Sequence, residues 1–434
     1  MRFATFAVAL AGGVGLVLGA SLSSPAWAQE SQLDSLRVVA NSSSGGPAAT
    51  LAFARALRRA GHSAEALAVL GRAKALASPE SEVLVSIDWE FARVQMDRHD
   101  FAQARAACRA LGARPGASAE GHACAAHAHL VRQRATEALA EVAAALAADP
   151  RCYEAKVAEG RAGELALDAT KSEAAFRAAI AWRPEGVDAH VGLGRALLRA
   201  GKREEGLAEL RRGVQLDPNG PEPLYELGMA VAPSGEGAAL LERATSERAS
   251  FADAWLALGA QELSAGRLAK ARSAAEAAVR RDATSVGPHV LLGKVALSDG
   301  RYDEAIKEGE AALKILANSA PAELLVADAD AKKGYLDRAL EAYQAAWGLD
   351  RSDPTPLVHA SEACHAAGRD TSARAFGTKA SQEFPEWGPA WAALGDALVG
   401  QGENRAARDA YAKALSGSGP VDRESVQKML ATLP

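Results

Sequence analysis

The sequence has few aromatic residues and no excess of positive charge. Aromatic side chains make up 5% of the 434 residues, and the formal net charge is −5. A protein that binds nucleic acid needs Lys and Arg along the path of the phosphate backbone, so this balance argues against a nucleic-acid partner. Segments in which β-branched and polar residues alternate are also missing, which favours helices over a β-sheet protein.

The sequence also lacks the local motifs that mark common enzyme classes. It contains no G-x-S-x-G nucleophile elbow, no P-loop, no H-E-x-x-H zinc motif and no Rossmann glycine set after a strand. Acidic pairs such as Glu204-Glu205 and Asp303-Glu304 fall at the starts of expected helices, where carboxylates complement the helix dipole. We therefore expect no catalytic activity and no bound cofactor.

Long apolar runs are absent apart from one at the N-terminus. Arg2 is followed by an apolar stretch over residues 3–22 and then by Ala26-Trp27-Ala28. This order of charge, apolar core and A-x-A pattern predicts a secretory signal peptide over residues 1–28, and export to the periplasm or the extracellular space. The alternative is an uncleaved membrane anchor, because the run is nearly long enough to span a bilayer. After cleavage we expect no stable membrane span.

A small residue recurs at a fixed period through most of the chain. From Ala126 onward every interval but one is 34 residues, and a fixed period of about 34 is typical of stacked helix pairs. The spacing from Gly228 to Gly259 is shorter and predicts a three-residue deletion in an inter-helix turn around residues 233–236. Eleven units follow from this column, which comprises Ala54, Ala92, Ala126, Gly160, Gly194, Gly228, Gly259, Gly293, Ala327, Ser361 and Gly395.

The two clearest units carry a recognisable pattern. One has Trp255, Leu258, Gly259, Ala271 and Ala278, and the other repeats these positions with Trp391, Leu394, Gly395, Ala407 and Ala414. This pattern, in a unit of about 34 residues, resembles the tetratricopeptide repeat. The resemblance covers residues 47–418 and implies an all-α fold, a right-handed α-solenoid of about eleven helix-turn-helix repeats. Residues 29–46 have the composition of a flexible linker, and residues 419–434 are expected to form a capping helix.

The resemblance also implies where a partner binds, because the first helix of each pair lines the concave groove in this family. Counting the small column as position eight, we expect an extended peptide or amphipathic helix to contact positions five and nine, with its acidic portion near Arg161 and Arg195. The alternative is that position five is partly buried between adjacent first helices and that the charges are solvated. Position five holds Val157, Val191, Tyr225, Leu256, Val290, Leu324 and Val358, and position nine holds Arg161, Arg195, Lys294, Asp328 and Glu362 among others.

Cysteines are few, and three of the four lie close together. Cys108, Cys124 and Cys152 fall in adjacent repeats, whereas Cys364 stands apart. Because cysteines in exported chains tend to pair, we favour a Cys108–Cys124 disulfide, with Cys364 as a buried thiol. Pairings that involve Cys152 and a chain with four free thiols are the alternatives.

A group of histidines invites a metal-site interpretation. Cys124 and His127 are three residues apart and could share a metal ion on one helix face. However, the column that holds Trp255 and Trp391 holds histidine in three other repeats. We therefore interpret these histidines as substitutes at an aromatic position and expect no metal; they are His122, His190 and His289.

These observations predict a non-catalytic scaffold or assembly factor of the cell envelope that binds a protein or peptide. The alternative is an accessory protein of an envelope polysaccharide synthesis or export system that docks a catalytic partner or a glycan. A sugar platform would need exposed aromatic rings, for which Tyr225 and Trp387 are the candidates outside the core columns. A homo-oligomer is a third arrangement that the sequence allows.

Overall fold

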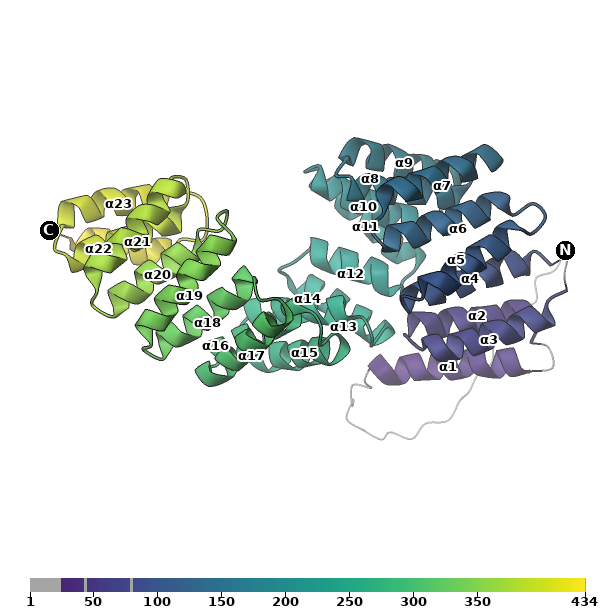
Figure 1. Ribbon diagram of the computed structural model, residues 1–434, viewed down its shortest axis with the longest axis horizontal. Helices are drawn as coiled ribbons and strands as arrows, with labels where there is room; N and C mark the ends of the chain where they lie inside the picture. The colour runs from purple at the N-terminus through teal and green to yellow at the C-terminus, as the bar shows by residue number, and fades with distance from the viewer. Residues whose placement is uncertain (1–24, 43–44, 79–80, 434) are drawn as a thin grey trace, which may run out of the picture.

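The computed structural model describes residues 25–42, 45–78 and 81–433, and these residues form 24 α-helices and no β-sheet. The predicted signal peptide lies outside the described residues, apart from its last four, which begin α1. No helix within the described ranges is both long and apolar enough to cross a membrane. Figure 1 shows the helices following one another along an elongated superhelix.

Eleven consecutive helix pairs make up the array, as the period predicts. α1 (Pro25–Asn41) precedes them and α24 (Arg423–Thr432) follows them. The pairs, numbered here as repeats 1 to 11, are α2 (Pro47–Arg59) with α3 (Ser63–Leu76), α4 (Val83–Asp97) with α5 (Phe101–Gly112), α6 (Ser118–Val131) with α7 (Ala135–Ala148), α8 (Tyr153–Leu165) with α9 (Ala169–Trp182), α10 (Val187–Arg199) with α11 (Arg203–Leu216), α12 (Pro221–Ala230) with α13 (Gly235–Glu247), α14 (Ala252–Ser264) with α15 (Leu268–Arg281), α16 (Val286–Ser298) with α17 (Tyr302–Ile315), α18 (Ala320–Lys332) with α19 (Leu336–Leu349), α20 (Thr355–Ala366) with α21 (Asp370–Glu383), and α22 (Gly388–Gly400) with α23 (Asn404–Ser416).

The recurring small residue sits where the two helices of a pair approach most closely. A Cβ atom on Gly160 would lie 2.7 Å from the ring of Phe176, and one on Gly395 would lie 2.5 Å from the ring of Tyr411. Both rings are fully buried. At these two positions a large side chain of the second helix fills the space that the small residue leaves open, whereas beside Gly259 and Gly293 a leucine of the next first helix does so.

The short interval between Gly228 and Gly259 has a different origin from the one predicted. α12 has ten residues, whereas α10 and α14 have thirteen each. Ser234 caps the N-terminus of α13 by accepting a hydrogen bond from the Gly237 amide. The first helix of this repeat is therefore three residues shorter than its neighbours and the second helix is one residue shorter, whereas the inter-helix turn is one residue longer.

The prediction of a flexible linker over residues 29–46 is wrong for residues 29–41. These residues belong to α1, in which Leu33, Leu36 and Ala40 recur at helical spacing and pack against the core of repeat 1. Arg37 also reaches Glu65 on α3, with the Nη2 atom 3.4 Å from Oε1. The apolar stripe was present in the sequence, but the polar residues around it dominated the composition.

Candidate functional site

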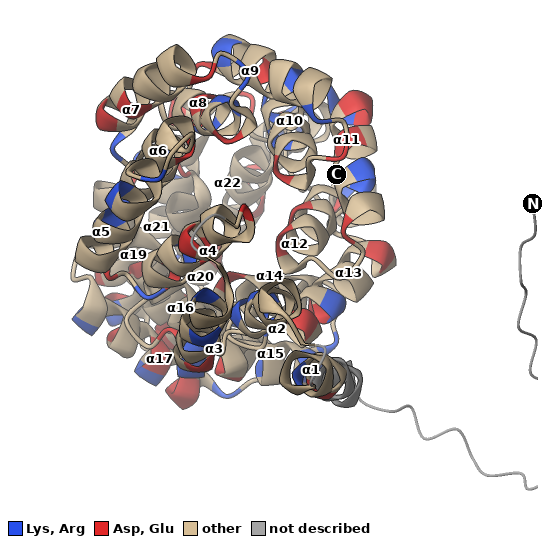
Figure 2. Cartoon of the chain, turned by 90° about the vertical axis from the view of Figure 1, so that its right-hand side faces the viewer, with Lys and Arg blue, Asp and Glu red and all other residues tan. Residues whose placement is uncertain are grey.

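The first helix of each pair forms the inner wall of the superhelix. Viewed along the N-terminal repeats, α4, α6, α8, α10 and α12 lie on the inside, and the second helices α5, α7, α9, α11 and α13 form the outer layer (Figure 2). Inter-helix turns connect the two layers. A surface that could hold a partner along the array is therefore built from the first helices, at the positions that the repeat pattern assigns to the groove.

Position five does not provide the continuous apolar ladder that we predicted. Val157, Val191, Val290 and Val358 are buried in separate core clusters between neighbouring helices. For example, Val191 packs so closely on α11 that a Cβ atom on Gly213 would lie 2.9 Å from its Cγ2 atom. These four valines hold repeats together, which is the alternative that the sequence left open, and only Tyr225, Leu256 and Leu324 in this column keep part of their surface exposed.

Position nine in repeats 4 and 5 carries arginines whose charge is already balanced. Arg161 Nη2 lies 3.3 Å from Asp188 Oδ1 on the next first helix. Arg195 bridges two repeats, because its Nη2 atom lies 2.7 Å from Glu164 Oε2 and its Nη1 atom lies 2.8 Å from Glu226 Oε1. An acidic ligand would have to displace these carboxylates, so the expectation that its acidic portion binds near Arg161 and Arg195 loses its basis.

The same region contains a histidine that is held neutral. His127 occupies position nine in repeat 3, where its Nδ1 atom is 3.5 Å from Arg161 Nη1 and its ring meets Trp89 edge to face. Burial lowers the pKa of His127, and the nearby positive charge of Arg161 lowers it further. Burial raises the pKa of Asp188, but Arg161, together with other cations, outweighs that effect and lowers it. In this part of the wall the positive charge of Arg161 is balanced by the negative charge of Asp188, beside a neutral histidine.

Position nine in repeats 9 to 11 carries an acidic column with its own hydrogen bonds. Asp328 accepts a hydrogen bond from the Tyr343 hydroxyl at 2.8 Å, and its Oδ1 atom is also 2.8 Å from His359 Nδ1. Asp396 accepts a hydrogen bond from Tyr411 at 2.6 Å. Burial raises the pKa values of both Glu362 and Asp396. The sequence identified the acids of this column but not the two tyrosines that orient them, although both tyrosines follow their aspartates at the same sequence spacing.

A cavity lies at the C-terminal end of this acidic column. Its volume is about 280 Å³, and Glu362, Asp396 and Tyr411 meet Val426 and Met429 of the capping helix across it. Tyr411 reaches the cavity from α23, whereas the two acids lie on α20 and α22. The cap therefore closes the end of the inner wall as well as covering the last repeat.

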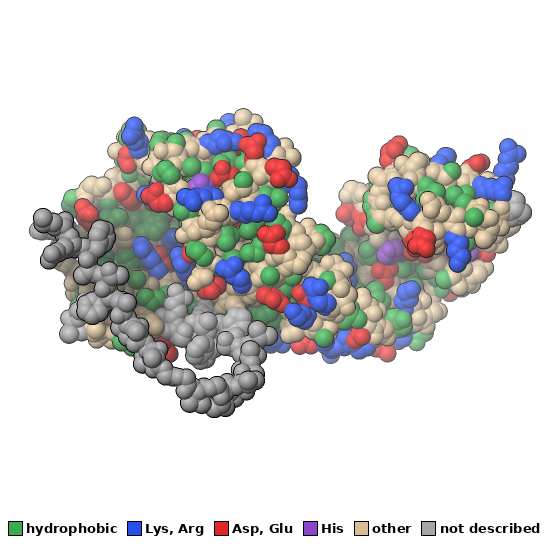
Figure 3. Space-filling view, turned by 180° about the vertical axis from the view of Figure 1, so that it is seen from behind, with side chains coloured by type: hydrophobic (Ala, Val, Ile, Leu, Met, Phe, Trp, Pro, Cys, Tyr) green, Lys and Arg blue, Asp and Glu red, His purple; other side chains and the backbone are tan. Residues whose placement is uncertain are grey.

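The middle of the inner wall carries exposed side chains at position nine in three consecutive repeats, 6 to 8. Met229 is 45% exposed, and Ala260 and Lys294 are exposed as well. Tyr225 and Leu256, at position five of repeats 6 and 7, are half-buried beside them. Figure 3 shows the molecule hollowed between its N-terminal and C-terminal groups of repeats, and in Figure 1 α14 to α17 lie between these two groups. The accessible apolar surface of the wall is therefore short and central.

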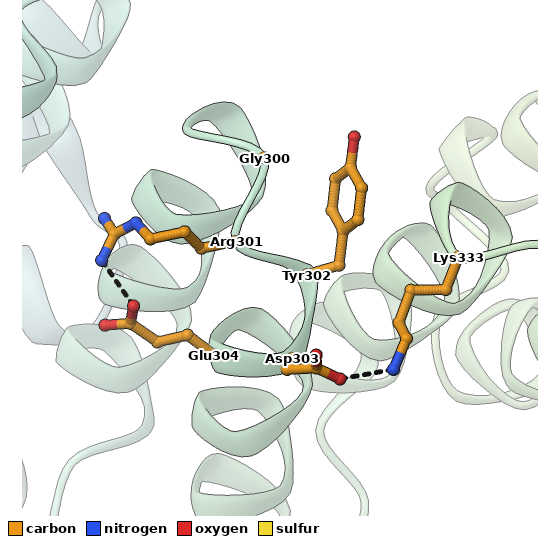
Figure 4. Close-up of a pocket in the computed structure, with 6 residues that line it drawn as sticks. All are labelled: Gly300, Arg301, Tyr302, Asp303, Glu304 and Lys333. Atoms are coloured by element: carbon orange, nitrogen blue, oxygen red, sulfur yellow. Dashed lines mark hydrogen bonds and ion pairs between the residues drawn. The ribbon is translucent and has the colours of Figure 1, made fainter.

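Another cavity, of about 380 Å³, lies at the outer turn of repeat 8 (Figure 4). Asp303 forms an ion pair with Lys333 there, and Arg301 forms one with Glu304 at 2.5 Å. Tyr302 projects away from both pairs. Because the charged groups of this cavity are already matched to one another, they do not converge on a ligand.

One histidine in the tryptophan column, His190, makes the same backbone contact as the indole ring. Trp391 Nε1 donates to the Pro385 carbonyl at 2.8 Å, and His190 Nε2 is 2.9 Å from the Pro184 carbonyl, at the same spacing in the sequence. The Nδ1 atom of each histidine in this column faces a glutamate on the second helix of its own repeat. Those pairs are His122 with Glu141, His190 with Glu209 and His289 with Glu308. In the described part of the chain, no three metal-capable side chains come together.

The structure joins Cys108 to Cys124, with a Cα–Cα distance of 5.4 Å. The bond connects α5 to α6 and therefore ties repeat 2 to repeat 3. Cys152 and Cys364 are free thiols, and both are buried. The two aromatic residues considered for a sugar platform are engaged within the fold, because Tyr225 packs on Phe251 at a ring distance of 5.0 Å and Trp387 packs over Gly419.

Comparison with known proteins gives no significant match among curated sequences. Among solved structures, yeast Tom70 is 13% identical over 89% of this chain and 94% of that chain, with a TM-score of 0.47. A tetratricopeptide repeat protein from Parabacteroides merdae is 15% identical over 64% of this chain and 97% of that chain, with a TM-score of 0.42. PilF from Pseudomonas aeruginosa is 16% identical over 48% of this chain and 97% of that chain, also with a TM-score of 0.42.

The family assignment depends on a direct sequence match together with the repeated helix pair. Residues 166–221 and residues 234–286 match the family model of the tetratricopeptide repeat. These two segments contain α9, α10, α11, α13, α14 and α15, which come from the centre of the array. The pair seen there recurs from α2 to α23. The two matched segments therefore belong to the tetratricopeptide repeat family, and the rest of the array repeats their helix pair.

Proposed function

We propose that this protein is a non-catalytic scaffold or assembly factor of the cell envelope, exported through its N-terminal segment, that binds a protein partner on the inner wall of the array. The secretory pattern of residues 1–28 supports export. Stacked helix pairs produce long concave surfaces on which an extended segment or a helix of a partner can lie.

The observation that carries this proposal is the exposed centre of the inner wall. Met229 and Ala260 are exposed, whereas the equivalent residues in repeats 4 and 5 are arginines held by carboxylates. Met side chains adapt to different apolar partners because they are unbranched and polarisable. An apolar segment of the partner would therefore contact Met229, Ala260 and the half-buried faces of Tyr225 and Leu256.

Charge gives the bound segment a direction. Lys294 is the exposed position-nine residue of repeat 8, and the acidic column with Asp328 and Glu362 begins in the next repeat. The partner's basic residues would reduce the repulsion between the carboxylates of that column. The partner is thus expected to place an apolar stretch over repeats 6 and 7 and basic residues toward repeats 9 to 11.

The test uses two substitutions at exposed positions. Val191→Asp or Val290→Asp would place a charge in the core and unfold the array, so those positions cannot report on binding. Met229→Asp/Ala260→Asp should leave the circular dichroism spectrum unchanged and abolish the enrichment of specific envelope proteins in quantitative pull-downs. Binding of the purified partner by calorimetry should then be lost with the same variant.

The matched control is Leu139→Asp, which places the same charge on an exposed apolar residue of the second helix α7, outside the inner wall. Leu139 is 43% exposed, close to the value for Met229. This control should keep the partners of the wild type. Equal binding by wild type and by Met229→Asp/Ala260→Asp would remove the centre of the inner wall as the binding surface.

A further inference from the structure

Repeat 1 contacts distant parts of the chain, in the loops that flank repeat 6. Arg59, at the end of α2, forms an ion pair with Asp217, with Nη2 3.0 Å from Oδ2. The backbone carbonyl of Arg59 accepts a hydrogen bond from Arg248 Nε at 3.0 Å, and Arg248 in turn pairs with Glu222 at 2.6 Å. These contacts join the α2–α3 turn to repeat 6, and we call them the seam.

Close backbone contact and helix packing extend the seam. A Cβ atom on Gly61 would lie 2.9 Å from Ser250 Cβ, so the two loops touch. α1 also lies against α13, whereas the other helix contacts of similar extent in the described chain join helices no more than two apart in sequence order. In Figure 2 the helices from α2 to α13 form a ring, and α1 lies where its two ends meet. The first turn of the superhelix is therefore closed on itself.

The seam differs in kind from the interfaces between consecutive repeats. Consecutive repeats share buried apolar clusters, such as the one that joins Val191 and Leu210 to Leu224. The paired side chains of the seam are charged and partly exposed, with 46% exposure for Arg59 and 21% for Asp217. Ion pairs that water reaches contribute little to stability and weaken as salt screens them. The ring therefore has one boundary that is held by partly exposed ion pairs, loop contact and the packing of α1 on α13, whereas its other boundaries share buried apolar clusters.

We propose that the seam is a salt-sensitive gate that opens the first turn of the array without unfolding any repeat. When the gate is closed, a partner reaches the inner wall of repeats 1 to 6 only through the two open ends of the ring. When the gate is open, the partner also reaches this wall from the side. That consequence for binding rests on the proposed function, whereas the opening itself does not. The C-terminal repeats lie beyond the ring (Figure 1), so its opening leaves their own arrangement unchanged.

Distance measurement across the seam tests the gate in the absence of any partner. Spin labels on Ala68→Cys in α3 and Ala239→Cys in α13 occupy positions on either side of it, and the native free thiols are buried. Salt is raised from about 0.01 M to about 1 M, over which the Debye length falls from about 30 Å to about 3 Å. We expect one short distance at low salt and a shift to a longer distance at high salt.

Charge variants separate the gate from a general effect of salt. Arg59→Glu should show the longer distance already at low salt, and the swap Arg59→Asp/Asp217→Arg should restore the short one. Arg177→Glu, which removes ion pairs with Glu173 and Glu205 away from the seam, should keep the short distance. A short distance that persists in Arg59→Glu and at high salt would overturn the gate, and so would a long distance in the wild type at low salt. Neither outcome would affect the binding result for Met229 and Ala260.

Discussion

Leu210 occupies the space beside Gly194 that a larger residue would need. A Cβ atom on Gly194 would lie 2.6 Å from Leu210 Cγ and 2.9 Å from the carbonyl oxygen of Gly206. Both glycines face the interface between α10 and α11, and Leu210 is fully buried there. The close approach of the Leu210 side chain and of the Gly206 backbone explains why position 194 holds a glycine.

This contact predicts the effect of adding a single methyl group. Gly194→Ala should lower the free energy of unfolding by about 1–3 kcal/mol, because the Gly206 backbone oxygen cannot move aside as a flexible side chain could. Gly71→Ala is the matched control, since nothing lies within 4 Å of a Cβ atom at that helical position. It should stabilise the protein by about 0.5–1 kcal/mol through lower chain entropy. Urea unfolding of both variants provides the measurement, and a loss of stability for Gly71→Ala would contradict the explanation.

The histidines of the inner wall should respond to pH in opposite ways. Burial lowers the pKa of His359, but the hydrogen bond and charge of Asp328 outweigh burial, so that its pKa is raised overall. The folded state therefore favours protonated His359, and its stabilisation is fully present below the unfolded pKa of about 6.5 and is lost as pH rises through the folded value. His127 has a lowered pKa, so it favours the folded state above about pH 6.5 and opposes it as pH falls further.

Nuclear magnetic resonance of the imidazole rings can check both signs. The pKa of His359 should lie above that of a histidine in the unfolded chain, and Asp328→Asn should lower it. His127 should stay neutral between about pH 5 and 8, the range in which an unperturbed histidine changes charge. In urea unfolding, the free energy of unfolding of wild type should exceed that of His359→Gln by an amount that shrinks as pH rises. His62→Gln, at a turn, is the control and should show no such pH-dependent difference. A His359 midpoint below that of the unfolded chain would refute the contribution of Asp328.

The disulfide between Cys108 and Cys124 should contribute measurably to stability. It closes a loop with a sequence separation of 16 residues, for which the chain-entropy estimate is about 3 kcal/mol. Reductant should therefore lower the urea midpoint of the wild type and have no effect on Cys108→Ser/Cys124→Ser. After unfolding without reductant, alkylation should modify two thiols, Cys152 and Cys364. Four modified thiols would show that the bond is absent in solution.

The sequence was sufficient for features that repeat and insufficient for those that occur once. Eleven pairs follow from the spacing of residues such as Gly194 and Gly395, because every unit reports the same interface. Whether Val191 is buried and whether Arg195 is paired depend on how tightly neighbouring repeats stack. The period of one unit contains no information on that stacking. The contact between Arg59 and Asp217 depends on the curvature accumulated over five repeats, which small differences at each interface determine.

Removal of the capping helix α24 should destabilise the repeats nearest to it. Val426 of α24 is buried, and Met429 and Leu430 cover the cluster that contains Leu394 and Tyr411. Deleting residues 420–434 would expose this cluster to water, so repeat 11 should lose protection from hydrogen exchange and the protein should self-associate in sedimentation experiments.

Each repeat in a linear array is stabilised chiefly by its neighbours, so the loss caused by this deletion should decline along the chain toward the N-terminus. Repeats 1 to 6, closed into a ring by the contacts of Arg59, should keep the exchange protection of the full-length protein. Met429→Ala, which trims the same surface without removing the helix, should give a smaller loss confined to α22 and α23. If protection fell equally in all repeats after the deletion, the array would unfold as a single cooperative unit, and the ring would have no stability of its own.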